Sequence, residues 1–245
     1  LNTKNRSTAR LSAIWRRIDR IYCISLADRK DRQACAKQQF ASVGLSGRVD
    51  FHFAQRHPQN SELGIYESHQ ACLKMGLDAG ARHMLVFEDD VVFGSVDADR
   101  LSAGIDFFMQ QKDCRLLLLG CLVSESRATQ SPAVRRGRYR CLAHAYLVDA
   151  PLARQMVETP WQGLAFDTAL RHWPDRHFAL YPSIAFQSHA ATDNTRHLRL
   201  DRIRRLCGGM RIIQLANEHY HRYSVIVIAA HVLVIGALML WILAG

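Results

Sequence analysis

The first ninety residues alternate between short apolar runs and helical stretches, and this alternation restricts the fold more than any other feature of the sequence. Apolar, strand-like runs at 21–26, 49–54 and 83–87 are separated by helical stretches at 29–44 and 66–80, each ending in a glycine. A strand–helix–strand–helix–strand order is typical of a mainly parallel sheet covered by helices. Ligands of such sheets bind beyond the carboxyl ends of the strands. The sequence therefore predicts an α/β domain with its site at that edge.

The rest of the chain continues the pattern and extends the predicted domain over residues 21–195. We expect three further helices and three further strands, at 101–111, 151–158 and 164–173 and at 115–120, 140–149 and 177–182 respectively. The stretch 124–139, "SESRATQSPAVRRGRY", is polar and contains Pro and Gly. It is predicted to be a loop that acts as a mobile lid.

Length and cysteine usage exclude a small stapled scaffold. A chain of 245 residues with 49% hydrophobic side chains can close a core without disulfides or a structural metal. Its seven cysteines are scattered, with no C-x-x-C pair among them. Neither a disulfide framework nor a zinc site is indicated, and a reducing compartment fits best.

The net charge of +10 is concentrated at the two ends of the chain. Residues 1–20 form a basic N-terminal segment with six basic and one acidic side chain, and residues 196–222 contain seven arginines against Asp201 and Glu218, so each end carries +5. The body between them is neutral. A nucleic-acid groove would spread its Lys and Arg through the folded domain, so a nucleic-acid partner is not expected.

Residues 224–244 form an uncharged apolar run in which His231 is the one ionisable group. As a helix it would be roughly 31 Å long, which matches the hydrocarbon core of a bilayer. A transmembrane helix is predicted, the alternative being a buried core helix. The arginine-rich segment precedes the run, so the positive-inside rule places the domain in the cytoplasm. No apolar stretch follows the basic N-terminus, so no signal peptide is expected.

The segment 196–222 has a helical apolar spacing of its own. Leu200, Ile203, Leu206 and Met210 recur every three or four residues, with arginines between them. An amphipathic juxtamembrane segment along the membrane interface is predicted. An ordinary surface helix packed on the domain would have the same pattern.

Three carboxylates follow the predicted strand 83–87 directly. With a period of two, Glu88 and Asp90 point to one side of the strand and Asp89 to the other. Carboxylate oxygens suit magnesium or manganese better than zinc, and such an ion can neutralise a diphosphate. The alternative is a solvated turn with acidic residues at its surface.

Anion donors are expected beside these acids. The motif "SLADRKDR" places Ser25, Arg29 and Arg32 at the end of the first strand and the start of a helix. Free N–H groups and guanidinium groups there favour phosphate oxygens, although basic first turns often face solvent only.

The ordered set of motifs resembles glycosyltransferase family 25, the bacterial lipooligosaccharide glycosyltransferases related to collagen galactosyltransferases. The motifs, over roughly residues 21–194, are "SLADRKDR", "GIYESHQACLKMGLDAG", "MLVFEDDVVF", "CLAHAYLVDAPLARQMV", "FDTAL" and "YPSIAFQ". The chain departs from the family pattern at Ile65, where a cysteine is usual, and at 191–194, where "ATDN" matches only loosely.

The resemblance implies a single nucleotide-diphospho-sugar transferase domain of the A type and an inverting transfer, most often of galactose, from a UDP-sugar donor. Glu88 and Asp90 would hold the metal, with His189 as a third ligand. Ser25, Arg29, Arg32 and Asp89 would contact the donor, as would Glu88. Ser68 and His69 would hold the donor sugar or order the acceptor, unless His69 is only a packed imidazole. Asp167 is the expected catalytic base. Its alternative is an acid that stabilises a helix N-terminus.

A lipid-linked acceptor such as a growing lipooligosaccharide, at the cytoplasmic face of a bacterial inner membrane, would explain the C-terminal anchor. Two other functions stay open. One is a metal-dependent phosphohydrolase with the same carboxylates, and the other is an inactive membrane-tethered binding protein with the same fold.

Overall fold

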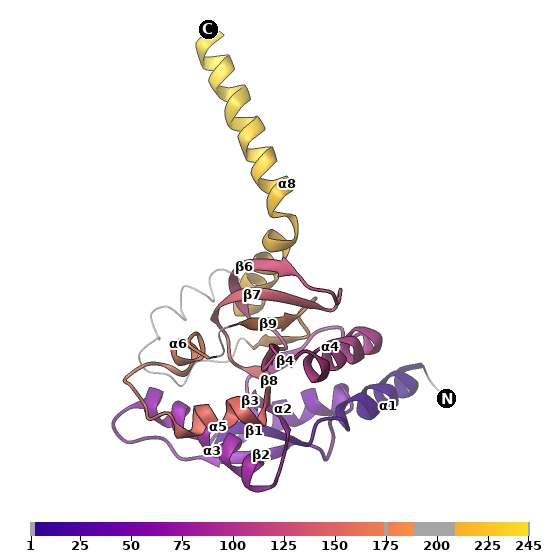
Figure 1. Cartoon of the computed structure of the whole chain (residues 1–245), viewed down its shortest axis with the longest axis vertical. Helices are drawn as coiled ribbons and strands as arrows, with labels where there is room; N and C mark the ends of the chain where they lie inside the picture. Colours follow the sequence, from indigo (N-terminus) through magenta and orange to yellow (C-terminus); the bar gives the residue numbers. More distant parts are fainter. Residues whose placement is uncertain (1–2, 174–175, 189–208, 245) are drawn as a thin grey trace.

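An eight-stranded sheet forms the centre of the computed structural model, which describes residues 3–173, 176–188 and 209–244 (Figure 1). The strand order is β2-β1-β3-β8-β5-β9-β7-β6. The strands are β1 (Arg20–Leu26), β2 (Asp50–Ala54), β3 (His83–Glu88), β5 (Leu116–Leu118), β6 (Leu122–Ala128), β7 (Val134–Cys141), β8 (Ala145–Asp149) and β9 (His177–Leu180). A separate antiparallel pair joins β4 (Val91–Phe93) to β10 (Ala185–Gln187).

The sheet is mixed, with most of its strands running in one direction. Three neighbouring pairs are parallel, β1 with β2, β1 with β3 and β5 with β9, and the other four are antiparallel. Across the whole sheet, β7 and β8 run in one direction and the other six strands run in the opposite direction. The predicted α/β fold with a mainly parallel sheet is confirmed.

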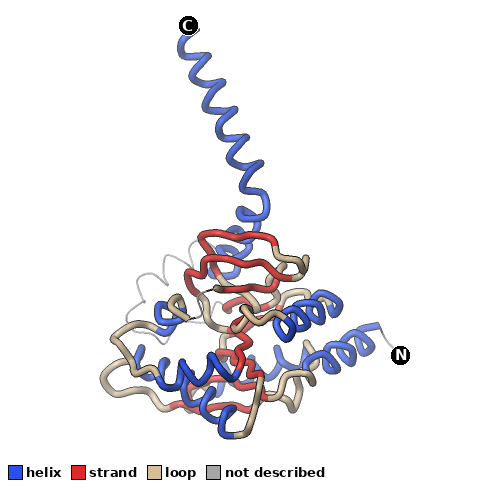
Figure 2. Tube along the Cα trace, viewed as in Figure 1, coloured by secondary structure: helices blue, strands red, loops and turns tan. Residues whose placement is uncertain are grey.

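Helices cover both faces of the sheet (Figure 2). The helices that pack on the sheet are α1 (Thr3–Trp15), α2 (Lys30–Ser42), α3 (Ser61–Asp78), α4 (Ala98–Gln110), α5 (Ala150–Glu158), α6 (Phe166–Leu170) and the first part of α8 (Gly209–Ala244). Successive side chains of a strand point to opposite faces of the sheet, so each strand contributes to two hydrophobic cores. Leu85 and Phe87 of β3 pack in the core with α1, α2 and α4, whereas Met84 and Val86 pack in the core with α3, α5 and α6.

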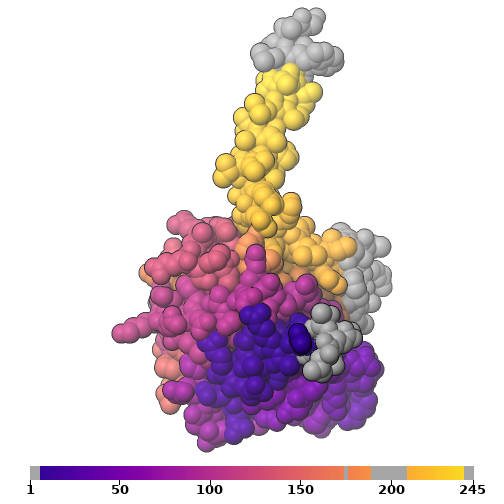
Figure 3. Space-filling model, turned by 90° about the vertical axis from the view of Figure 1, so that its right-hand side faces the viewer, coloured from indigo at the N-terminus to yellow at the C-terminus, as the bar shows by residue number. Residues whose placement is uncertain are grey.

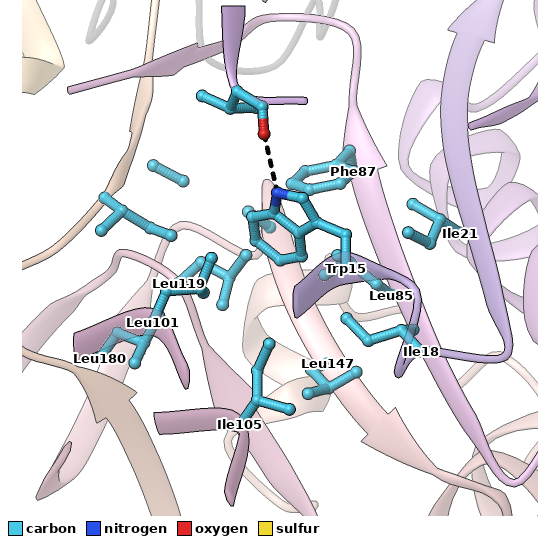
Figure 4. Close-up of a cluster of buried hydrophobic side chains, with 14 of the residues drawn as sticks. Trp15, Ile18, Ile21, Leu85, Phe87, Leu101, Ile105, Leu119, Leu147 and Leu180 are labelled. Atoms are coloured by element: carbon cyan, nitrogen blue, oxygen red, sulfur yellow. Dashed lines mark hydrogen bonds between the residues drawn. The ribbon is translucent and has the colours of Figure 1, made fainter. Parts of the chain in front are cut away.

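Helix α1 belongs to the packed domain, which therefore extends beyond the expected boundary at residue 21. Leu11, Ile14, Trp15 and Ile18 are buried, and the Trp15 indole donates a hydrogen bond to the carbonyl of Val43 over 2.9 Å (Figure 4). Part of the basic charge of this segment is paired with α4, through the ion pairs Arg10–Asp99 and Arg17–Asp106.

The stretch 124–139 was predicted to be a loop, and this prediction is wrong. It forms most of the antiparallel hairpin of β6 and β7 at the edge of the sheet. The sequence is misleading because only one face of an edge hairpin needs apolar side chains, and here those are few: Val134 and Tyr139 are buried while the residues between them are not. The predicted strand 140–149 is interrupted at Leu142, whose φ of +80° separates β7 from β8.

Helix α8 has two parts that meet at Tyr223, where φ of −115° and ψ of 17° are not helical. In the first part Met210 and Gln214 are buried against the domain. The described part of the expected interfacial segment, 209–222, therefore packs on protein, and the other three residues of its apolar pattern, Leu200, Ile203 and Leu206, lie outside the described residues.

The second part of α8 projects away from the domain (Figures 1 and 3). Its apolar side chains are open to the surroundings, from Val225, which is 79% exposed, to Met239, which is 55% exposed. Within the described residues, this is the one helix that is long and apolar enough to cross a membrane.

Candidate active site

A cleft of about 330 Å³ lies at the carboxyl ends of β1, β2 and β3. The three parallel strands end side by side, which brings the residues that follow them to one place. The cleft is lined by three groups of residues, from β1 and α2 (Ile24, Ser25, Leu26, Arg32), from the β2–α3 connection and α3 (Ala54–Ser61, Gly64, Ile65, Ser68, His69), and from the end of β3 with β10 (Glu88, Asp89, Asp90, Gln187).

Asp89 connects the acidic turn to β1 and α2. Its Oδ2 accepts a hydrogen bond of 2.6 Å from the Ser25 hydroxyl, and its Oδ1 accepts one of 3.0 Å from Arg32 Nη1. Burial raises the pKa of this carboxyl, while the Ser25 hydrogen bond and the Arg32 charge oppose that shift. Both oxygens are engaged with protein, so Asp89 fixes the geometry of the turn.

Asp90 presents a free acceptor. Its Oδ2 accepts a hydrogen bond of 2.8 Å from Gln187 Nε2 and lies 3.9 Å from Arg32 Nη2. Its Oδ1 is buried and has no hydrogen-bond partner among the residues that the structure describes. A buried carboxylate oxygen without a donor is costly, and a ligand that supplies positive charge would remove that cost.

Glu88 faces His69 on the α3 side of the cleft. His69 Nε2 lies 3.5 Å from Glu88 Oε1, and its Nδ1 lies 3.0 Å from the Tyr146 hydroxyl. The ring stacks on Phe166 with 3.6 Å between centroids. Burial lowers the pKa of His69 to about 3, so the ring is neutral and the contact with Glu88 is not an ion pair. Burial, together with the negative charges of Asp90 and Asp167, raises the pKa of Glu88.

The donor set of the cleft fits a hard divalent cation such as Mg²⁺ or Mn²⁺. It offers carboxylate oxygens from Glu88 and Asp90, and Asp90 Oδ1 has no hydrogen-bond partner among the described residues. The surroundings of Glu88 disfavour the negative charge of its carboxylate, and a cation would compensate for this. Within the described residues, no group of three His, Cys, Asp or Glu side chains is arranged to hold a metal ion. Two protein carboxylates are nevertheless sufficient for magnesium, which usually takes its other ligands from water and substrate phosphates.

The structure brings together seven of the ten residues predicted for the site: Ser25, Arg32, Ser68, His69, Glu88, Asp89 and Asp90. Arg32 differs from the expectation in that its guanidinium is held by Asp89, at a side-chain exposure of 12%. Arg29 pairs with Asp31 over 2.9 Å and does not line the cleft. His189 lies outside the described residues, so its role as a metal ligand stays a prediction.

Asp167, the predicted base, is not among the described residues that line the cleft. Its Oδ1 accepts hydrogen bonds from the Tyr139 hydroxyl and the Ala143 amide, and its Oδ2 accepts one from the Leu142 amide. The carboxylate thus holds the break between β7 and β8, and it also adds negative charge near Glu88. This arrangement gives Asp167 a structural role, and its action as a base stays a prediction.

Sequence reasoning missed two parts of the site. The connection 55–60, "QRHPQN", forms one wall of the cleft, with Arg56 paired to Asp28 and Asn60 capping α3. It follows β2 directly, so the rule that located the acids after β3 would have located it as well. Gln187 gave no such signal, because its contact with Asp90 depends on the pairing of β10 with β4.

Comparisons with known proteins return distant similarities of fold. No family profile matches the sequence, and no curated relative was found. Among solved structures, A197 from STIV is 11% identical with a TM-score of 0.46, covering 68% of this chain and 83% of that one. A UDP-glucose pyrophosphorylase complexed with UDP-glucose is 12% identical with a TM-score of 0.42, covering 74% and 79%. A glycosyltransferase involved in glycosylation of the major capsid of PBCV-1 is 10% identical with a TM-score of 0.39, covering 65% and 79%.

Proposed function

We propose that the chain is a glycosyltransferase that binds a nucleotide-sugar donor in the cleft at the ends of β1, β2 and β3. The observation that carries the proposal is the acidic turn after β3, in which Asp89 is fixed by Ser25 and Arg32. Asp90 keeps a buried oxygen that no described residue contacts by a hydrogen bond. This arrangement is suited to a cation that accompanies a diphosphate. Polar groups of the 55–60 connection line the same cleft and could donate or accept hydrogen bonds with a nucleotide.

Different residues of the cleft would bind the metal and position the binding groups. Glu88 and Asp90 would hold a magnesium or manganese ion. When bound, the ion would supply Lewis-acid stabilisation of the charge on the departing diphosphate. Arg32 and Ser25 keep the acidic turn in place, and Arg56, which is paired with Asp28, lines the wall formed by residues 55–60. His69, neutral and stacked on Phe166, gives the floor of the cleft a fixed polar edge beside Glu88.

The finer assignments rest on the resemblance to glycosyltransferase family 25. On that basis we propose inverting transfer of a sugar, with galactose from UDP-galactose the first donor to test. The acceptor would be a lipooligosaccharide or another lipid-linked glycan, at the cytoplasmic face of a bacterial inner membrane. The exposed apolar part of α8 supports an acceptor of this kind, because it would keep the cleft close to a lipid-linked substrate.

The test is a thermal-shift screen of the full chain in neutral detergent micelles, against nucleotide sugars with and without manganese. A donor that binds the native state raises its melting temperature. The stabilising donor is then incubated with a lipid-linked acceptor, and both transferred and free sugar are measured. Transfer that requires Asp90 supports the proposal. Release of phosphate or free sugar without transfer would favour the phosphohydrolase, and absence of any metal-dependent nucleotide binding would favour the inactive binding protein.

A further inference from the structure

The hairpin of β6 and β7 presents three arginines on one face. Arg127 stands directly opposite Arg136 in the antiparallel register, and Arg138 follows two residues along on the same face of β7. Together with Glu125 and Gly137 they line a hollow of about 200 Å³, in which Glu125 is the one acidic residue. Its carboxylate is 3.9 Å from Arg138, and both side chains are largely exposed. We refer to Arg127, Arg136 and Arg138 as the arginine face.

Like charges placed directly opposite one another destabilise a sheet. An anionic partner bound between the arginines would replace this repulsion between like charges with attraction. Guanidinium groups form paired, charge-assisted hydrogen bonds with phosphate oxygens, so three of them around one hollow are suited to phosphate groups.

The free edge of the same hairpin, along β6, is attached to α8. The Asn217 side chain accepts a hydrogen bond from the Val123 amide over 3.0 Å and donates one to the Val123 carbonyl over 2.9 Å. His221 Nε2 lies 3.0 Å from the same carbonyl. The hairpin is therefore held against the domain-proximal part of α8, as the position of β6 and β7 beside this helix shows (Figure 1).

The exposed apolar run of α8 begins at Val225, four residues after His221. The break at Tyr223 lies between them, and four residues span at most about 14 Å even when fully extended, so the two positions are close together. Between the two residues, Arg222 lies 5.9 Å from the centre of the Tyr181 ring and 5.1 Å from that of Tyr223. Tyrosine and arginine at the end of an apolar helix are typical of the headgroup layer of a membrane. If α8 crosses a membrane, a hairpin fixed at this level stands at the membrane surface.

We propose that the arginine face binds the phosphate headgroups of anionic phospholipids in the membrane that α8 crosses. The inference rests on the proposed membrane attachment of α8 and is independent of the transferase activity. It gives the domain a second contact with the membrane, which would fix its tilt relative to α8 across the break at Tyr223. The occupant is a lipid headgroup, since β6, which lines the hollow, is an edge strand and is hydrogen-bonded to α8 close to the start of its exposed apolar run.

The test uses the full chain in micelles of a neutral detergent, titrated with phosphatidylglycerol, with phosphatidylcholine or with inorganic phosphate. The apparent Kd of each is taken from the rise in melting temperature. The test variant carries Arg127→Gln, Arg136→Gln and Arg138→Gln. The matched control carries Arg16→Gln, Arg100→Gln and Arg154→Gln, three exposed arginines of the same domain that lie elsewhere on its surface.

Phosphatidylglycerol is expected to stabilise the wild type more than phosphatidylcholine does. The test variant should bind it at least about tenfold more weakly, since one arginine at an anionic surface contributes roughly fivefold in affinity. The control should bind it as the wild type does. Without lipid, the test variant should melt no lower than the wild type, because the cross-strand repulsion has been removed. If the triple substitution nonetheless prevents folding, the single variant Arg136→Gln takes its place, with an expected loss of about fivefold.

Unchanged affinity of the test variant for phosphatidylglycerol would overturn the proposal. The proposal would also be overturned if inorganic phosphate raised the melting temperature of the wild type as much as phosphatidylglycerol does at the same concentration. Membrane attachment is measured separately, by washing membranes that contain the full chain with alkaline carbonate. Release of the chain would refute the anchor whatever the titrations give. Activity enters neither measurement, so failure of the proposed transferase function is distinguishable from failure of this inference.

Discussion

The Ser25 hydroxyl donates a 2.6 Å hydrogen bond to Asp89 across 64 residues of sequence. The contact joins the carboxyl end of β1 to the acidic turn after β3, two strands that pair in parallel. With Asp89 fixed in this way, the neighbouring carboxylates Glu88 and Asp90 are left to the cleft. One acid of the three thus serves the structure and two remain for a ligand.

Arg32 should be a large contributor to stability, because it compensates buried negative charge. In Arg32→Met, Asp89 would remain 7% exposed beside Asp90 without its guanidinium partner. Removing one partner of a buried pair costs about 3–5 kcal/mol. The matched control is Arg29→Met, since Asp31, the partner of Arg29, is 67% exposed. It should cost less than about 1 kcal/mol. Chemical unfolding of both variants in neutral micelles measures the difference, and equal losses would contradict the prediction.

Asp90→Asn should abolish sugar transfer and leave the fold intact. The substitution removes one ionised ligand from an oxygen-ligated cation site, whereas the Gln187 contact can persist and the crowding of like charges decreases. Activity is measured across a manganese series, with Asp78→Asn as the control, because that exposed carboxylate pairs with Lys74 at the end of α3 and does not line the cleft. Near-normal turnover of Asp90→Asn at low manganese would show that Asp90 does not hold the metal.

Asp167→Asn separates the structural role seen in the fold from the predicted catalytic one. The amide cannot accept hydrogen bonds at both of its terminal atoms, so it loses part of the set from Tyr139, Leu142 and Ala143. A loss of about 1.5–3 kcal/mol in stability is expected. If Asp167 is also the base, turnover well below the melting temperature should fall strongly while donor affinity is kept. If turnover falls only in proportion to the fraction of folded protein, Asp167 has a structural role and is not the base.

The sequence was informative wherever the burial pattern is strong. The alternation up to residue 90 predicted β1, α2, β2, α3 and β3. The strands β1 and β3 are buried apolar runs, the edge strand β2 still carries apolar side chains, and a glycine follows each of the two helices. It was uninformative at the edge of the sheet, where β6 and β7 carry arginines and serines on a face that no core constrains. The acidic turn was predictable from its position after a buried strand. The break at Leu142 and the contact between Asp90 and Gln187 were not, because tertiary packing decides both.

The apolar residues of α1 have a helical spacing that predicts packing on the domain, but the basic charge of the segment drew attention away from this pattern. Leu11, Ile14, Trp15 and Ile18 recur at helical spacing between basic residues, and all four are buried. A segment with this spacing is an amphipathic helix that packs on the domain, and its arginines pair with α4 in the structure.

Trp15→Ala tests whether α1 is integral to the domain. The indole is fully buried in the core between the sheet, α2 and α4, and its N–H satisfies the Val43 carbonyl (Figure 4). The next residue, Gly44, has φ of +78°, and a Cβ at this position would lie 2.6 Å from the Thr8 carbonyl oxygen. The backbone of α1 therefore packs closely against the chain at Gly44. A loss of about 3–5 kcal/mol is expected. Arg16→Ala, at an exposed position of the same stretch, should change stability by less than about 0.5 kcal/mol. Equal melting temperatures for the two variants would mean that α1 is only loosely attached and that the domain begins at β1.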